Sequence, residues 1–290
     1  MLESTVPACT ERGSPRIRDV AELEKIARSL RRQVIHMVAP TGQGYVQQGL
    51  GAADLFAALY FAEMRLDPQN PQWPERDRFL LSTAHNTAIF YATLAARGLI
   101  DAALLPTYCH DGSVLEINAS ERVGTVVEAT CGSLGQGLSV GVGMALAARR
   151  RGFDSRVYVV LGDGELQEGQ VWEAALAAGS YGLGQLCLLI DYNEMQVEGH
   201  VDKVMAMEPV AAKWQAFNWR VETIDGNDIE ALLGALDRAR ACTDRPTCIV
   251  ARTLAGKGAA CLEGVLGHTM KLPPEMAQRA LAELAELAGE

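Results

Sequence analysis

The chain of 290 residues is 49% hydrophobic and 21% charged, and its formal net charge is −10. This length and composition suit a globular protein with a full core, and an acidic chain without a basic stripe argues against a nucleic-acid partner. No apolar run approaches the roughly 20 residues of a membrane helix, and the first residues lack the apolar core of a signal peptide. We therefore expect a cytoplasmic protein with no membrane partner.

The seven cysteines are an odd number at irregular spacing, and none forms a CxxC pair. This pattern argues against a disulfide framework and against a zinc site. Reduced and mostly buried thiols are expected instead.

The first half of the chain begins with residues 1–18, which contain Pro and Ser without periodicity, and we expect a flexible N-terminal arm there. Apolar residues then recur at helical spacing, with Asp19 as a plausible N-cap. The expected elements follow in chain order: a helix over 20–38, a helix over 52–64, a strand over 78–82, a helix over 86–98, a strand over 123–130 and a helix over 138–152.

The second half alternates short β-rich runs with helical segments. Strands are expected over 157–161, 186–190, 220–224 and 247–252, with helices over 168–180 and 228–240. This alternation predicts an α/β fold in which a parallel β-sheet is sandwiched by helices. No linker divides the chain, so residues 19–290 are expected to form a single domain.

The stretch LGDGELQEGQ, at 161–170, places a carboxylate between two glycines directly after an apolar strand. In an open α/β sheet, ligands bind beyond the carboxyl ends of the strands, and Asp163 and Asn193 follow two successive strands. A carboxylate and an amide oxygen are hard ligands that suit Mg²⁺ or Ca²⁺. Glycines at 162 and 164 would let a diphosphate approach backbone N–H groups.

A simpler interpretation of GDG is a tight turn with a capping aspartate. The strand before it, the helix after it and the asparagine beyond the next strand favour a metal–diphosphate site instead.

The span GDGELQEGQVWEAALAAGSYGLGQLCLLIDYNEMQVEG, at 162–199, resembles the thiamine diphosphate motif in its transketolase form. The stretches RDRFLLSTAH at 76–85, EATCGSLGQGLSVGVGMALA at 128–147 and IDGNDIEAL at 224–232 look like the same family. The matches run from about residue 20 to 273. The resemblance is to the N-terminal, diphosphate-binding half of a transketolase, as found in two-subunit versions of the enzyme, and it implies the thiamine diphosphate-binding fold.

The resemblance also implies roles for the matching residues. Mg²⁺ would be held by Asp163, Asn193 and the main-chain carbonyl of Met195. Glu168 matches an acidic residue at the subunit interface that links paired active sites, and His268 is the candidate for an active-site histidine beside the reacting carbons. The other residues expected to contact the cofactor are His85, Gly132, Leu134, Gly162, Gly164 and Glu165.

Two positions depart from the family. Gln43, in TGQGY, and Asn118, in DGSVLEINAS, stand where transketolases have histidines that contact the sugar. Neither side chain titrates near neutral pH, although both still form hydrogen bonds. We therefore expect cofactor binding to be intact. The ketol donor or acceptor, which is a sugar phosphate or another small molecule, is expected to differ from those of ordinary transketolases.

Thiamine chemistry needs a glutamate beside the pyrimidine ring, and in this family a second, pyrimidine-binding domain supplies it. We expect the chain to be inactive alone and to pair with a separate pyrimidine-binding subunit in an α2β2 or larger assembly. Two alternatives stay open: a thiamine-dependent subunit that decarboxylates 2-oxo acids and delivers a two-carbon unit to a lipoyl group or carrier protein, and a non-catalytic module that retains the fold.

Overall fold

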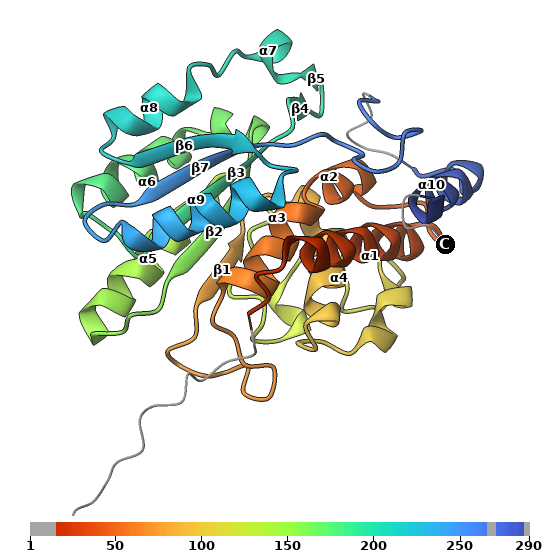
Figure 1. Ribbon diagram of the computed structural model, residues 1–290, viewed down its shortest axis with the longest axis horizontal. Coiled ribbons are helices and arrows are strands. Elements are labelled where there is room, and N and C mark those ends of the chain that lie inside the picture. The colour runs from red at the N-terminus through yellow and green to blue at the C-terminus, as the bar shows by residue number, and fades with distance from the viewer. Residues whose placement is uncertain (1–15, 266–270, 287–290) are drawn as a thin grey trace, which may run out of the picture.

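A central parallel β-sheet organises the molecule (Figure 1), and the computed structural model describes residues 16–265 and 271–286. The sheet has five strands in the order β1-β2-β3-β7-β6, and every neighbouring pair is parallel. The strands are β1 (Arg78–Leu81), β2 (Val157–Gly162), β3 (Leu186–Tyr192), β6 (Arg220–Asp225) and β7 (Thr247–Arg252). The predicted parallel sheet is confirmed.

Helices cover both faces of the sheet, and alternate residues of each strand enter two separate cores. In β2, Tyr158 and Val160 pack into the core with α1, α3, α4 and α9, whereas Val157 and Val159 pack into the core with α5, α6 and α8. The helices are α1 (Val20–Val38), α2 (Val46–Gly51), α3 (Ala53–Ala57), α4 (Thr87–Ala96), α5 (Gln136–Arg151), α6 (Gly169–Ser180), α7 (Val201–Val204), α8 (Val210–Ala216), α9 (Ile229–Ala241) and α10 (Pro274–Glu286).

Two expected elements differ from the structure. The strand predicted over 123–130 is wrong: a short 3₁₀ turn, η4 (Glu121–Val123), leads into turns there. Gly124 at φ +117 interrupts the extended run, and Glu128 forms ion pairs with Arg76 and Arg78 instead of joining a ladder. The helix predicted over 52–64 is divided into α3 and a π-helical segment, η1 (Ala58–Glu63).

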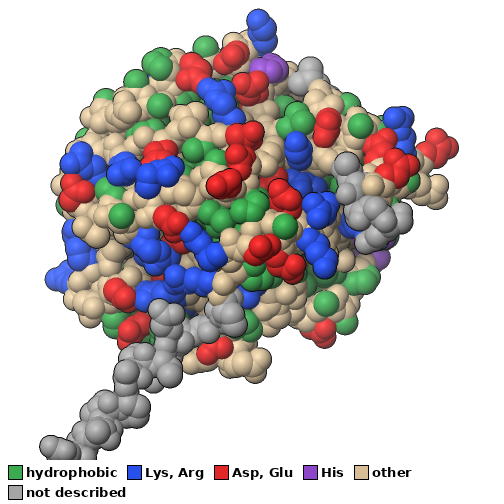
Figure 2. All heavy atoms as spheres, in the orientation of Figure 1, with side chains coloured by type: hydrophobic (Ala, Val, Ile, Leu, Met, Phe, Trp, Pro, Cys, Tyr) green, Lys and Arg blue, Asp and Glu red, His purple; other side chains and the backbone are tan. Residues whose placement is uncertain are grey.

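The expected N-terminal arm lies largely outside the described residues. Of its last three residues, Ile17 donates its backbone N–H to the carbonyl of Phe61 at 2.8 Å, and Arg18 forms an ion pair with Asp237. No helix within 16–265 or 271–286 is long and apolar enough to cross a membrane. Acidic and basic side chains are interspersed over the face shown in Figure 2.

Helix α6 is held close to its neighbours at its C-terminal end. A Cβ atom at Gly179 would lie 1.8 Å from the carbonyl oxygen of Phe217, so only glycine fits there. The side chain of Asn218 donates to the carbonyl of Gly179 at 3.3 Å, and the indole of Trp219 donates to the carbonyl of Ala175 at 2.9 Å. The axial position of α6 is therefore fixed by close backbone contact.

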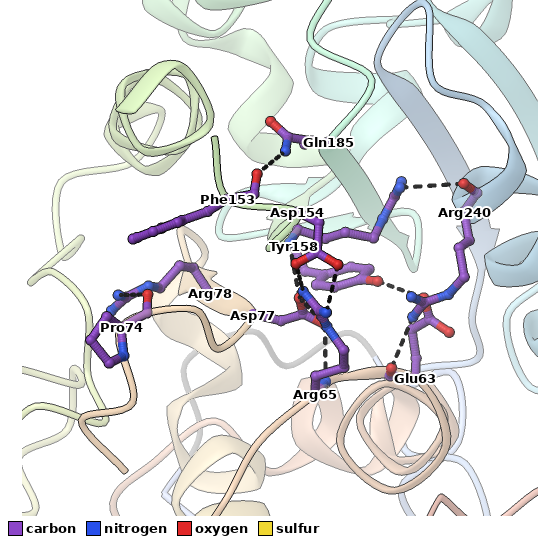
Figure 3. Close-up of polar contacts among 11 residues, drawn as sticks. Glu63, Arg65, Pro74, Asp77, Arg78, Phe153, Asp154, Tyr158, Gln185 and Arg240 are labelled. Carbon is purple, nitrogen blue, oxygen red and sulfur yellow. Dashed lines mark hydrogen bonds and ion pairs between the residues drawn. The ribbon is translucent and has the colours of Figure 1, made fainter. Parts of the chain in front are cut away.

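Buried carboxylates at the amino-terminal edge of the sheet are paired with arginines (Figure 3). Glu63 accepts hydrogen bonds from the hydroxyl of Tyr158 at 2.5 Å and from the guanidinium of Arg240 at 2.6 Å. Asp77 accepts from the backbone N–H of Arg65 at 2.9 Å and lies 3.4 Å from its guanidinium. At this edge, both of these buried negative charges have a positive partner.

Candidate functional site

A cavity of about 340 Å³ lies at the opposite, carboxyl-terminal edge of the sheet. It is enclosed by the tips of β2 and β3, the 3₁₀ turns η2 (Ala84–Asn86) and η5 (Gly164–Gln167), and the hairpin of β4 (Met195–Gln196) and β5 (Gly199–His200). Most of the residues predicted for the site line this cavity: His85, Leu134, Gly162, Asp163, Gly164, Glu165, Glu168, Asn193 and Met195. The geometry that the strand order predicted is therefore present.

The parallel register brings Asp163 and Asn193 together. Gly162 of β2 is paired with Asp191 of β3, so the residues that follow these strands stand at neighbouring tips. Asp163 is only 1% exposed; its carboxylate accepts from the backbone N–H of Gly164 at 2.7 Å and from that of Glu194. The hairpin is thus attached directly to the carboxylate.

The amide of Asn193 is oriented by residues on either side of it, Asp191 at the end of β3 and Met195 at the start of β4. Its Oδ1 accepts from the backbone N–H of Met195 at 3.1 Å, and its Nδ2 donates to Asp191 Oδ2 at 3.3 Å. Asp191 also accepts from Asn86 Nδ2 at 2.9 Å and from the hydroxyl of Thr253. Asp191 was missed in the sequence, although an acidic residue inside the apolar run LCLLIDY was a signal that could have identified it.

Three buried carboxylates, those of Asp163, Glu165 and Asp191, meet at this edge. Burial raises the pKa of Asp163 to about 8, and the nearby Asp191 carboxylate adds to the rise. Burial likewise raises the pKa of Glu165 to about 7 and raises that of Asp191. The hydrogen bonds that these acids accept come from amide N–H and hydroxyl groups of the described residues. A cation placed here would relieve an unfavourable concentration of negative charge.

The donor set suits a hard cation. Within 16–265 and 271–286, no group of three or more His, Cys, Asp or Glu side chains could hold a metal ion. A metal in this cavity would therefore take mixed oxygen ligands: the Asp163 carboxylate, the Asn193 amide oxygen and the Met195 carbonyl oxygen. Mg²⁺ and Ca²⁺ accept such mixtures and complete their shells with water or phosphate oxygens.

The two glycines that flank Asp163 lie very close to side chains of neighbouring segments. A Cβ at Gly164 would lie 2.9 Å from Gln196 Cβ, and one at Gly162 would lie 3.2 Å from Thr83 Oγ1. Side chains at these positions would push the hairpin and the tip of β1 away from the cavity. The glycines therefore permit the backbone on either side of Asp163 to pack closely against Gln196 and Thr83.

The remaining wall carries an aromatic pair that was not anticipated. The rings of Tyr45 and His85 meet edge to face, with centroids 4.7 Å apart, and both residues line the cavity. Leu134 contributes from the glycine-rich loop, and its carbonyl accepts from Gln170 Nε2 at 2.8 Å. Glu168 is exposed at the N-cap position of α6.

Other predicted residues lie away from the cavity wall. Gly132 is exposed and adjoins Asn118, whose Nδ2 would be 3.7 Å from a Cβ at Gly132. Asn118 Oδ1 is buried without a hydrogen-bond partner among the described residues, and Gln43 is exposed. His268 lies outside the described residues, so its role stays a prediction.

The family model for the thiamine diphosphate binding domain of transketolase matches residues 23–275. The 6-deoxy-6-sulfo-D-fructose transketolase subunit SqwG of Clostridium sp. (strain MSTE9) is 40% identical over 91% of this chain and 96% of that protein. An apulose-4-phosphate transketolase subunit of Phocaeicola vulgatus is 34% identical over 92% of this chain and 95% of that protein.

Solved structures agree with this relationship. The transketolase of Campylobacter jejuni superposes with a TM-score of 0.86 at 31% identity, and the match covers 92% of this chain and 43% of that one. The transketolase of Leishmania mexicana superposes with a TM-score of 0.85 at 30% identity, over 94% and 42%. The chain thus spans less than half the length of these enzymes. It belongs to the transketolase family and corresponds to the N-terminal, thiamine diphosphate-binding subunit of split transketolases.

Proposed function

We propose that this chain is the diphosphate-binding subunit of an enzyme that transfers a two-carbon ketol unit with thiamine diphosphate and Mg²⁺, or Ca²⁺ in its place. The observation that carries the proposal is the pair Asp163 and Asn193 at neighbouring strand tips, inside a cavity whose buried carboxylates accept from neutral donors. When bound, thiamine diphosphate supplies the electron sink for making and breaking the carbon–carbon bond. The transketolase relatives favour ketol transfer over decarboxylation of 2-oxo acids.

Each wall of the cavity has a role in this proposal. Asp163, Asn193 and the Met195 carbonyl hold the cation, and the backbone around Gly162 to Glu165 faces the diphosphate. His85, stacked edge to face on Tyr45, donates to a diphosphate oxygen. Glu168, exposed at the start of α6, faces a neighbouring subunit, and His268 acts beside the reacting carbons.

Cofactor binding is tested by titrating thiamine diphosphate into the full chain, purified with its partner, with Mg²⁺ and with EDTA. Saturable binding is expected only with the cation. Asn193→Ala removes a proposed ligand of the cation and is expected to weaken binding by at least the roughly tenfold to hundredfold that the loss of an outer-shell partner costs. Asn70→Ala is the matched control, because Asn70 is exposed. Equal binding with EDTA, or an unchanged Asn193→Ala variant, would contradict the metal site.

We propose that a separate pyrimidine-binding subunit completes the active site, in an α2β2 assembly. Two relatives that cover this chain almost end to end are named as subunits, and the chain covers only 43% of a solved transketolase. The test is to purify the two subunits separately and to measure activity before and after mixing, together with the mass of the complex. Full activity of the isolated chain would refute the two-subunit proposal.

We also propose a donor or acceptor other than the ordinary sugar phosphates. Relatives are named for 6-deoxy-6-sulfo-D-fructose and for apulose 4-phosphate, and Gln43 and Asn118 replace the family's sugar-contacting histidines. The paired subunits are assayed with xylulose 5-phosphate and ribose 5-phosphate and with a panel of modified ketoses. Slow turnover of the ordinary pair is expected, and turnover at usual transketolase rates would defeat the proposal.

A further inference from the structure

A buried carboxylate connects the glycine-rich segment 131–137, here called the loop although its last two residues begin α5, to the sheet. The side chain of Glu165 belongs to a residue that is only 2% exposed. Its Oε1 accepts from the hydroxyl of Ser82 at 2.5 Å and from the N–H of Gly135 at 2.6 Å, while its Oε2 accepts from the N–H of Gly162 at 3.1 Å. One side chain therefore joins the loop, the residue after β1 and the end of β2.

The loop has little freedom to move away from this connection. Ser82 Oγ accepts from the N–H of Gly137 at 3.0 Å, and a Cβ at Gly137 would lie 2.5 Å from Ser82 Cβ. Gly135 adopts φ +86, and a Cβ there would lie 2.8 Å from Glu168 Cβ. The backbone of this segment is thus pressed against Ser82 after β1 and against Glu168 at the start of α6, and its N–H groups point at Ser82 and Glu165.

We propose that Glu165 is a positioning residue whose carboxylate holds the loop 131–137 in place, so that Leu134 keeps its position in the cavity wall. The family resemblance gave only the backbone of Glu165 a role, facing the diphosphate. The part of the inference that concerns cofactor affinity rests on the proposed function, because Leu134 is expected beside the cofactor rings. The part that concerns the loop rests on the hydrogen bonds alone.

The chemistry of the contacts separates a carboxylate from an amide. Ser82, Gly135 and Gly162 all present donors to Glu165, so both carboxylate oxygens act as acceptors. In Glu165→Gln, one oxygen becomes an NH₂ group, which cannot accept from a backbone N–H. At least one of the two glycine N–H groups therefore loses its partner, although the side chain keeps its size and shape.

The test is hydrogen–deuterium exchange, followed by mass spectrometry, on the full chain purified with its partner. Glu165→Ala, which removes both acceptor oxygens, is expected to speed exchange in peptides that cover 131–137 by about tenfold, the effect of losing one charge-assisted hydrogen bond. Glu165→Gln is expected to do so at Gly135 or at Gly162, whichever N–H loses its partner. Ser82→Ala, a second variant for the case that the first fails to fold, is expected to speed exchange around Gly137. Glu230→Gln, which changes an exposed carboxylate on α9, is the matched control.

Thiamine diphosphate titration of the same samples gives the second readout. Glu165→Ala is expected to raise the dissociation constant about tenfold while exchange in β3, β7 and α9 stays unchanged. Unchanged exchange at 131–137 in Glu165→Ala, or equal acceleration throughout the chain, would overturn the positioning role. Faster loop exchange with unchanged affinity would overturn its link to the cofactor. If wild type binds no thiamine diphosphate, the proposed function fails, and the exchange result still decides the loop inference.

Discussion

The two edges of the sheet treat buried negative charge in opposite ways. At the amino-terminal edge, Glu63 has Arg240 as its ion-pair partner and Asp77 has Arg65 (Figure 3). At the carboxyl-terminal edge, Asp163 accepts hydrogen bonds from backbone N–H groups, and burial raises its pKa. The first arrangement is complete within the chain, whereas the second becomes favourable when a cation joins it. We therefore expect the amino-terminal edge to stabilise the fold and the carboxyl-terminal edge to bind the proposed cation.

The largest expected effect comes from neutralising the carboxyl-terminal edge. Asp163→Asn removes the charged ligand of the proposed cation, so the dissociation constant of thiamine diphosphate with Mg²⁺ should rise by more than about a hundredfold. The control is Asp154→Asn, which removes an exposed carboxylate beside Arg65 at the other edge and should leave the affinity unchanged. Calorimetric titration measures the dissociation constant of each variant. An equal loss of affinity in the two variants would contradict the proposal that only the carboxyl-terminal edge binds the cofactor.

Breaking an ion pair at the amino-terminal edge should have the converse effect. Arg240→Ala leaves Glu63 buried at 2% exposure with the hydroxyl of Tyr158 as its donor, and the free energy of unfolding should fall by about 3 kcal/mol. Cofactor affinity, measured below the melting range of the variant, should not change. Arg245→Ala serves as the control, because Arg245 pairs with Asp244 at the exposed surface. A loss of cofactor affinity in Arg240→Ala without a loss of stability would contradict the purely structural role of the amino-terminal edge.

The pH dependence of stability should differ between the cation-free and cation-bound states. Asp163 has a folded pKa of about 8 against about 4 in the unfolded chain, so the folded state retains its proton more strongly. Its contribution to stability is full below about pH 4 and is lost as pH rises toward about 8. With EDTA, the stability of Asp163→Asn relative to wild type should therefore rise between about pH 5 and pH 8, by on the order of 4 kcal/mol.

Urea unfolding at several pH values measures this difference. With saturating Mg²⁺ and thiamine diphosphate, the advantage of Asp163→Asn at high pH should disappear and wild type should be the more stable protein. The reason is that the bound cation stabilises the ionised carboxylate of Asp163. A pH-independent difference in EDTA would show that Asp163 carries no raised pKa.

The smallest effect is expected from a single added methyl group. Gly164→Ala places a Cβ 2.9 Å from Gln196 Cβ and should destabilise the chain by about 1 kcal/mol as the hairpin shifts. Gly143→Ala is the matched control: Gly143 lies on α5 with nothing within 4 Å, and the change should stabilise by up to about 1 kcal/mol. Thermal unfolding measures the change in melting temperature of the two variants. Equal changes would show that the packing around Gly164 is not tight.

Local signals predicted the elements that local chemistry determines. Helix α1 has the predicted bounds, Val20–Val38, because Asp19 caps its first turn by accepting from the N–H of Glu22 at 2.8 Å. The strands of the sheet follow short apolar runs, which a parallel sheet buries on both faces. Asp163 and Asn193 were predicted to lie together because parallel register requires it, and they line one cavity.

The features that the sequence did not predict depend on contacts between segments that lie far apart in the chain. The segment 123–130 has strand composition, yet Glu128 pairs with Arg76 and Arg78, which lie far earlier in the chain, and the segment forms turns. The edge-to-face contact of Tyr45 and His85 likewise joins residues that belong to different elements. Asp191 acquires its place from Asn86 and Thr253, and no local pattern encodes those partners.

The close contact of Gly179 with Phe217 links the C-terminal end of α6 to the cavity at its N-terminal end. The helix begins at Gly169, beside Glu168 in the cavity wall, and Gly179 lies about 15 Å further along its axis. A larger side chain at 179 would collide with the carbonyl of Phe217, and a shift of α6 that relieves this contact would also move Glu168 at its start. Substitutions at 179 would therefore change the position of a cavity-lining residue without altering any side chain that lines the cavity.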